Sequence, residues 1–164
     1  MFKNSEKAPK SYTPLEALPK IAAFCAYQER TQKEVEEKLK SYGLDEDEAG
    51  EIIIRLSREK LLDEERYAQA YARGKHRTNG WGRRRIKMEM KAKGLSEYCI
   101  KSGLKELDGD EYYAKLKQLL EQRDAREKES HPMKRKLKLT AYLIQKGYES
   151  DLIQEALGEL AGEA

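Results

Sequence analysis

The 164-residue sequence lacks the features that mark secreted, membrane-spanning and disulfide-rich proteins. Its two cysteines, Cys25 and Cys99, form no Cys-x-x-Cys pair and have no histidine at ligand spacing, which argues against a disulfide framework and a zinc site. Its apolar runs stay well short of the ~18 residues of a transmembrane helix. Its first residues have no apolar signal-peptide core. We therefore expect a cytoplasmic protein without membrane contact, with both thiols reduced.

Motifs for catalysis and cofactor binding are missing as well. His76 and His131 fall in different parts of the chain, and no serine lies in a Gly-x-Ser-x-Gly turn. No Gly-Lys-Ser/Thr phosphate loop is present. The acidic runs at residues 45–48 and 63–65 stand where helices are expected to start, which favours capping over cation binding. The sequence predicts a non-enzymatic protein without catalytic residues, cofactor or metal.

Few valines and threonines are available to build a sheet. Apolar residues and charged residues each make up 38% of the chain, and the mean hydropathy is −0.93. This balance is typical of a helical protein with a large surface. We therefore expect an all-α fold.

Helix signals recur along the first third of the chain. Residues 1–13 are polar and aperiodic, and we expect a disordered arm there. The first helix begins at Pro14 behind Thr13 as cap, or at Pro19, and runs to about residue 29. Residues 31–34 read as a capping box, in which a threonine hydroxyl and a glutamate carboxylate satisfy each other's backbone donors.

An internal repeat is the main structural inference from the sequence. Six positions, counted from a glycine that ends a helix, agree in three copies. The matching sets are Val35, Ile86 and Leu139; Leu39, Met90 and Leu143; Gly43, Gly94 and Gly147; Ala49, Ile100 and Ile153; Ile53, Leu104 and Leu157; Leu56, Leu107 and Leu160. We expect three tandem three-helix repeats, at residues 14–62, 63–107 and 108–164, forming an elongated, curved helical array.

Positive charge is concentrated in residues 73–93, where nine basic residues and one acidic residue give a local charge of +8. The whole chain carries only +3. On a helical wheel, Ile86 and Met90 share one face while Arg84, Lys87 and Lys91 line another. Such a run can be a solvated helix face or a contact surface for a negatively charged partner.

Trp81 stands just ahead of this basic helix, between two glycines, and is either an anchor for repeat packing or an exposed contact residue. Arg85 and Glu89 are four residues apart and are expected to neutralise each other in part. The candidate partner-binding or nucleic-acid-binding residues are Trp81, Arg83, Arg84, Lys87 and Lys91.

The sequence resembles the RecX family of regulators of the RecA recombinase, on three segments at residues 61–68, 80–86 and 90–95. Residues on the positions typical of that family are Asp63, Tyr67, Ala68, Gly82, Ile86, Lys93 and Gly94. Glu64 and Met90 depart from it mildly, standing for an aspartate and a leucine. The resemblance covers residues 20–160, in the same three-repeat order.

The resemblance implies a protein that lies in the groove of the RecA–DNA filament and bridges neighbouring protomers. There it would restrain filament extension, ATP hydrolysis, strand exchange and repressor co-cleavage as a negative modulator. We expect a monomer whose partner is the RecA filament, with DNA in the filament as a further contact. The alternative is a helical protein that binds nucleic acid directly and without sequence specificity, through phosphate contacts of its basic residues. An undetected enzyme is a third reading.

Overall fold

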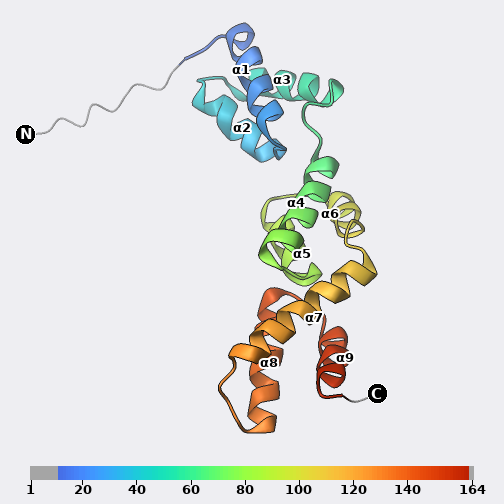
Figure 1. Cartoon of the computed structure of the whole chain (residues 1–164). Helices are drawn as coiled ribbons and strands as arrows, with labels where there is room; N and C mark the ends of the chain where they lie inside the picture. The colour runs from blue at the N-terminus through green and yellow to red at the C-terminus, as the bar shows by residue number, and fades with distance from the viewer. Residues whose placement is uncertain (1–10, 163–164) are drawn as a thin grey trace, which may run out of the picture. The chain divides into compact units, whose positions relative to one another are not determined.

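The computed structural model describes residues 11–162, which fold into nine helices and no strand (Figure 1). The helices are α1 (Pro14–Tyr27), α2 (Gln32–Ser41), α3 (Glu46–Arg58), α4 (Glu64–Asn79), α5 (Arg83–Ala92), α6 (Glu97–Leu104), α7 (Gly109–Arg126), α8 (Pro132–Lys146) and α9 (Ser150–Leu160). The prediction of an all-α fold is confirmed. Between residues 11 and 162, every helix is too short or too polar to span a bilayer.

Side chains that cap helix starts explain most of the observed boundaries. Thr13 accepts from the backbone N–H of Glu16, so α1 begins at Pro14 and runs through Pro19. The full capping box is at α3, where Asp45 and Glu48 each accept from the other's backbone N–H. At α2 the Thr31 hydroxyl accepts from the N–H of Glu34, but within the described residues the Thr31 N–H makes no return bond to the Glu34 carboxylate. The expected capping box at residues 31–34 is thus only half formed.

The predicted repeat register matches the burial of the three middle helices. Val35, Leu39, Ile86, Met90 and Leu143 are fully shielded from solvent. Each of these helices ends at a glycine with a left-handed backbone, as φ is 86° at Gly43, 80° at Gly94 and 101° at Gly147. Left-handed residues let the chain turn back and satisfy the last carbonyls of a helix. This shared turn fixes the third helix of each repeat against the second.

Two of the predicted inner positions depart from this register. Leu104 is only half-buried, and Leu160 is 39% exposed, although its counterparts Leu56 and Leu107 are buried. Leu160 is the last residue of α9, and it lies at the open rim of a hollow shared with Leu120 and Lys117. The helix ends before a further turn could cover it.

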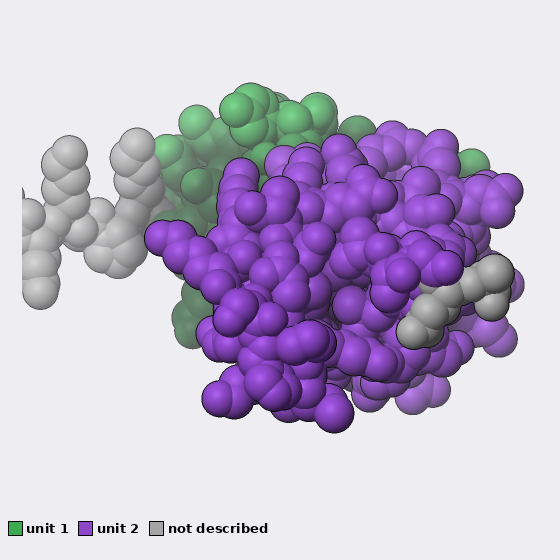
Figure 2. All heavy atoms as spheres, turned by 60° about the horizontal axis from the view of Figure 1, so that its bottom comes forward, with its two compact units in different colours: residues 1–67 green, residues 68–164 purple. Residues whose placement is uncertain are grey.

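The helices group into two compact units, one reaching to Tyr67 and the other beginning at Ala68 (Figure 2). The first unit has its own core, built mainly from α1, α2 and α3. The second unit contains most of α4 and all of α5 to α9, so the second and third repeats share one compact unit. The exact ends of the three predicted repeats stay a prediction.

The predicted disordered arm falls mostly on residues 1–10, which lie outside the described residues. Its last part does not fit that expectation. Tyr12 donates its backbone N–H to the carbonyl of Tyr42 at 2.8 Å, and the two rings meet edge to face at 5.4 Å. Aromatic pairing of this kind ties the start of α1 to the end of α2.

Replacing Ile86 by Ala tests the register. Ile86 is fully buried in α5, so the loss of three carbons should lower the free energy of unfolding by about 2–4 kcal/mol. Urea denaturation measures the change. Lys87→Ala, an exposed neighbour in the same helix, is the matched control and should shift stability by less than about 0.5 kcal/mol. Equal effects of the two variants would contradict the burial pattern.

Candidate interaction surface on α5

Three of the five predicted contact residues share the solvent face of α5. Arg84, Lys87 and Lys91 are all exposed, whereas Ile86 and Met90 on the opposite face are fully buried. Within residues 11–162, the three cations belong to none of the ion pairs. We call Arg84, Lys87 and Lys91 the α5 stripe.

The start of α5 carries positive charge where helices favour negative charge. The helix dipole places a partial positive charge at an N-terminus, and acidic side chains are the stabilising choice there. α5 has no acid in its first turn, which instead holds Arg83, Arg84 and Arg85. The local sequence therefore works against helix stability at this end. Such conflicts between local preference and fold are typical of binding sites.

Trp81 lies at the edge of this surface and is half-buried. Its ring faces two cations, with Arg85 Cζ 4.3 Å and Lys75 Nζ 5.1 Å from the ring centroid. Arg85 thus contacts the indole ring, and the expected Arg85–Glu89 pair is not among the ion pairs of the described chain. The arrangement lies between the two alternatives for Trp81, because the ring packs inside the repeat and keeps part of its surface in solvent.

The N-terminus of α5 is completed by the third repeat. Its N-cap, Gly82, has no side chain that could bind the free N–H groups of the first turn. Gly82 N–H donates to the carbonyl of Lys146 at 2.8 Å, and Arg84 N–H donates to the carbonyl of Gly147 at 3.0 Å. Arg83 N–H donates to the hydroxyl of Tyr112 at 2.9 Å. Backbone and side-chain oxygens from α7 and the end of α8 therefore replace a cap.

The opposing end of α4 is capped from the same repeat. Lys115 Nζ donates to the carbonyl of Arg77 at 3.2 Å, and Lys146 Nζ donates to that of Asn79 at 3.1 Å. The buried hydroxyl of Tyr148 donates to the carbonyl of Gly80 at 2.9 Å. Cations at a helix C-terminus also interact favourably with its dipole. The α4–α5 connection is thus held at both ends.

Two glycines allow this close approach. A Cβ on Gly82 would lie 2.4 Å from the carbonyl carbon and oxygen of Gly147 and 2.6 Å from the backbone nitrogen of Tyr148. A Cβ on Gly147 would lie 2.4 Å from the Cβ of Arg85. Backbone meets backbone here, so no flexible side chain can move away. Gly147 also needs its left-handed φ of 101°.

Arg83 has an internal role that separates it from the α5 stripe. Its guanidinium lies over the Tyr112 ring, 3.8 Å from the centroid, and donates to the carboxylate of Glu149 at 2.9 Å. Tyr112 donates its hydroxyl hydrogen to the same carboxylate. Burial, followed by this hydrogen bond, raises the pKa of Tyr112 well above its ordinary value. A partner would have to displace Glu149 to reach Arg83.

His76 completes the buried side of the junction and is only 6% exposed. Its ring stacks on Tyr112 at 5.2 Å between centroids and meets Tyr148 at 6.5 Å. Its Nδ1 lies 2.9 Å from the carbonyl oxygen of Trp81, which can only accept, so Nδ1 carries the hydrogen. Burial lowers the pKa of His76, although the Trp81 carbonyl acts in the opposite direction.

Sequence reasoning missed this junction, although the repeat register held a signal for it. Two residues after the helix-ending glycine, Asp45 and Ser96 each cap the next helix through their side chains. Glu149 occupies the same position in the third repeat but makes no cap to α9. Glutamate is not among the residues preferred at an N-cap, so its carboxylate is available for another partner. In this unit that partner is the pair Arg83 and Tyr112.

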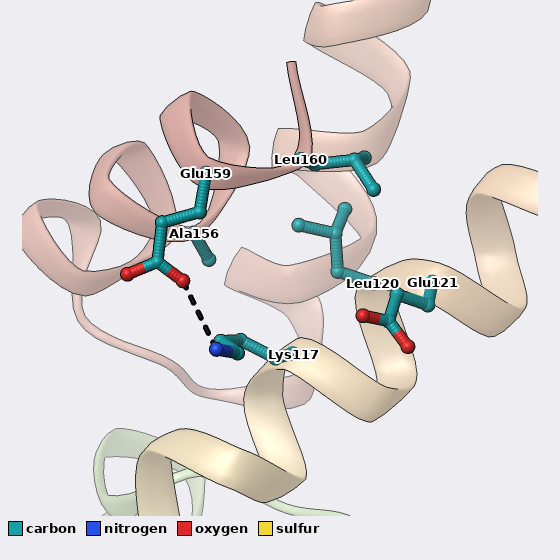
Figure 3. Close-up of a pocket in the computed structure, with 6 residues that line it drawn as sticks. All are labelled: Lys117, Leu120, Glu121, Ala156, Glu159 and Leu160. Carbon is teal, nitrogen blue, oxygen red and sulfur yellow. Dashed lines mark ion pairs between the residues drawn. The ribbon is translucent and has the colours of Figure 1, made fainter. Parts of the chain in front are cut away.

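A hollow of about 290 Å³ lies between α7 and α9 (Figure 3). Lys117 and Glu159 form an ion pair at 3.1 Å across it, and Leu120 and Leu160 lie on its apolar side. Both charged groups are close to half exposed, so the pair contributes little to stability.

Comparison with known proteins places all three repeats in one family. Models of the first, second and third three-helix domains of RecX match residues 21–56, 63–104 and 110–157. The crystal structure of RecX from Lactobacillus salivarius has a TM-score of 0.83 at 28% identity, covering 90% of this chain and 96% of that one. A second RecX crystal structure, at 23% identity and a TM-score of 0.75, covers 86% of this chain and 71% of that one and has the same fold.

Relatives of known description agree with these matches. The regulatory protein RecX of Oceanobacillus iheyensis is 30% identical over 138 residues, which are 84% of this chain and 50% of the relative. The regulatory protein RecX of Bacillus cytotoxicus is 30% identical over 159 residues, 97% of this chain and 57% of the relative. The chain therefore spans little more than half the length of the curated relatives it matches.

The glycine contact gives a first prediction for this junction. Gly82→Ala should lower the free energy of unfolding by about 1–3 kcal/mol, because the new methyl group meets backbone atoms that cannot yield. Gly74→Ala is the matched control, since Gly74 is an exposed residue within α4 whose added Cβ would meet no atom within 4 Å. That change should instead stabilise the protein by about 0.5–1 kcal/mol. Urea denaturation of both variants decides whether α5 and the third repeat are in contact.

The buried histidine gives a pH dependence. The folded protein holds the His76 proton less tightly than the unfolded chain, whose histidines titrate near pH 6.5. The contribution of neutral His76 to the free energy of unfolding is therefore fully present above about pH 6.5. It is lost as the pH falls from that value toward the lower pKa of the folded state. Thermal melts should show a drop in Tm between about pH 7.5 and pH 5.5.

The same melts on a variant assign this drop. His76→Gln should flatten it. A parent-like pH profile in His76→Gln would show that another group is responsible.

Proposed function

The chain belongs to the RecX family, whose three domain models together cover most of it, and on that premise we propose that it is a non-enzymatic regulator of the RecA recombinase. The relatives carry the description of a regulatory protein. The protein acts as a negative modulator in DNA repair, recombination and the SOS response. It works as a monomer in the cytoplasm, where its two free thiols stay reduced.

The site of regulation is the groove of the RecA–DNA filament. A chain of three-helix repeats bound there contacts more than one protomer and limits filament extension, ATP hydrolysis and strand exchange. We assign the protein no catalytic or cofactor chemistry, so it acts through contacts between its surface and a partner. DNA within the filament is a further contact.

The α5 stripe is the part of the surface that contacts the filament. The observation that carries this assignment is that Arg84, Lys87 and Lys91 are exposed and free of internal ion pairs within the described chain. Their neighbour Arg83 is already paired with Glu149. Carboxylates of the recombinase or phosphates of the bound DNA neutralise the three cations. Trp81 flanks the stripe and adds an aromatic contact.

Direct binding of nucleic acid without the recombinase is the second candidate function. It is favoured by the cations around Trp81, because aromatic rings next to basic groups suit stacked bases and phosphates. With three stripe contacts, the logarithm of the binding constant would fall with the logarithm of salt concentration with a slope of about −3. Binding to DNA alone that is as tight as binding to the filament would favour this candidate.

Replacing Arg84, Lys87 and Lys91 together by Ala should weaken inhibition of the DNA-dependent ATPase of RecA by about tenfold or more. Three contacts worth roughly 0.5–1 kcal/mol each give this factor. Helicity and Tm should hardly change, because exposed residues are exchanged for a good helix former. The half-inhibitory concentration and co-sedimentation with RecA filaments are the measurements.

The matched control is Lys33→Ala with Lys40→Ala on α2. These two exposed lysines occupy the positions of Arg84 and Lys91 in the first repeat, and their loss should leave inhibition within about twofold of the parent. A stripe variant that inhibits like the parent would show that the stripe is only solvated surface. A parent protein without effect on the ATPase, even in excess over protomers, would refute the recombinase proposal itself.

A further inference from the structure

One exposed face of α8 carries a row of mainly apolar residues. Met133 is 65% exposed, Leu137 is 63% exposed and Ile144 is 51% exposed. With Thr140 and Ala141 they lie at helical spacings of three and four residues, so they form one face. The core residues of α8, Leu139 and Leu143, lie on another side and are buried. We call Met133, Leu137, Thr140, Ala141 and Ile144 the α8 face.

The repeat register shows that the fold does not require an apolar surface here. The middle helices of the three repeats can be compared at ten, seven and three residues before their final glycines. At these positions α2 has Lys33, Glu36 and Lys40, α5 has Arg84, Lys87 and Lys91, and α8 has Leu137, Thr140 and Ile144. The same face is thus mixed in charge in the first repeat, basic in the second and apolar in the third. Exposed apolar residues in a contiguous row mark interaction sites.

The start of α8 is held firmly although it covers no core. α8 begins with a turn that α2 and α5 lack, and this turn carries Met133. The Arg135 guanidinium fixes the turn by donating to the carboxylate of Asp124 at 2.7 Å and to the carbonyls of Asp124, Glu127 and Glu129 at 2.5–2.9 Å. Because the half-buried Arg135 makes several charge-assisted hydrogen bonds, it holds the end of α7 against the start of α8. The α8 face is therefore preorganised, which lowers the entropy that binding must overcome.

Basic residues surround the α8 face. The α8 segment has five basic residues and no acid. Lys134 and Lys136 are exposed on either side of the apolar row. Along one edge runs a groove of about 410 Å³ between α7 and α8, lined in part by Ala141 and by Lys138 and Arg123, which both form ion pairs with Glu127. Among the described residues, the unpaired charges beside the row are therefore those of Lys134 and Lys136. Apolar anchors and side-chain carboxylates are what such a surface can receive.

We propose that the α8 face is a docking site for an acidic amphipathic helix of a partner protein. The partner helix lays its apolar residues along the row from Met133 to Ile144 and sets its carboxylates against Lys134 and Lys136. This contact is separate from the α5 stripe and does not depend on which protein the stripe binds. Together they give the second compact unit one basic and one apolar contact surface.

The charge pattern favours this occupant over three others. A second copy of the chain would bring lysines against lysines on both sides of the row. Nucleic acid would place its bases and phosphates against aliphatic side chains, which offer no hydrogen-bond donors. A lipid surface calls for a wider apolar face with aromatic anchors, whereas this row contains Thr140 and no aromatic residue. A groove beside the row also suits side chains better than a flat bilayer.

The test uses the full chain and a fluorescent helical peptide of about 18 residues, with leucines at i, i+4, i+7 and i+11 and flanking glutamates. Fluorescence anisotropy should show micromolar binding. Leu137→Gln with Ile144→Gln should weaken peptide binding about tenfold or more, because two apolar anchors are lost. The helix should persist, since Gln is a good helix former. The matched control is Ile54→Gln on α3, where Ile54 is 54% exposed, and it should bind like the parent.

A charge variant tests the acidic part of the proposal without removing an anchor. Ala141→Glu places a carboxylate at the groove edge of the face, and it should weaken binding of the acidic peptide about tenfold or more. A peptide with lysines in place of the glutamates should bind the parent about tenfold less tightly and should gain affinity for Ala141→Glu. Melting curves establish that each variant is folded.

Several results would overturn the proposal. These are equal binding of the acidic and the basic peptide, equal loss in Ile54→Gln, or no peptide binding by the parent. Binding of the parent to phosphatidylserine vesicles that is lost in the Leu137 and Ile144 variant would assign the face to a lipid surface. A dimer in sedimentation that dissociates in the same variant would assign it to a second copy. Peptide binding by the α5 stripe variant should stay parental, so either proposal can fail without the other.

Discussion

The start of α5 depends on oxygen atoms from a different repeat. A helix begins with N–H groups that have no partner inside it, and Gly82 at the N-cap has no side chain to bind them. The carbonyls of Lys146 and Gly147 and the hydroxyl of Tyr112 accept these hydrogens. Leaving a buried N–H unpaired costs about 1–3 kcal/mol. The second and third repeats therefore stabilise each other and form one compact unit.

This junction determines which basic residues remain available. The backbone of Gly82 can approach Gly147 only because neither residue has a Cβ. At that distance Arg83 reaches Glu149 and covers the ring of Tyr112, so its charge is neutralised within the protein. The helix then continues with its apolar face inward, Arg85 packs on the Trp81 ring, and Arg84, Lys87 and Lys91 point to solvent. The basic residues of α5 thus separate into two arginines with internal contacts, Arg83 and Arg85, and the exposed α5 stripe.

A common helical register supports surfaces of different chemistry. Burial requires apolar residues on the inner side of each middle helix, and Leu39, Met90 and Leu143 meet this requirement. The outer side is mostly exposed, so its residues can vary without loss of the fold. In α5 that side is basic, and in α8 it is aliphatic and rimmed by lysines. The repeat provides the scaffold, and the exposed face of each copy provides its own contact chemistry.

The sequence alone determined the all-helical fold, the repeat register and the inner and outer faces of α5. These depend on periodicity and on glycines such as Gly94, which act over a few residues of chain. Tertiary structure decided the rest. The roles of Arg83, His76 and Glu149 follow from contacts between α4, α5, α7 and the turn before α9, residues far apart in the chain. No local pattern encodes such distances, because a hydrogen bond across repeats exists only once both repeats have folded and packed.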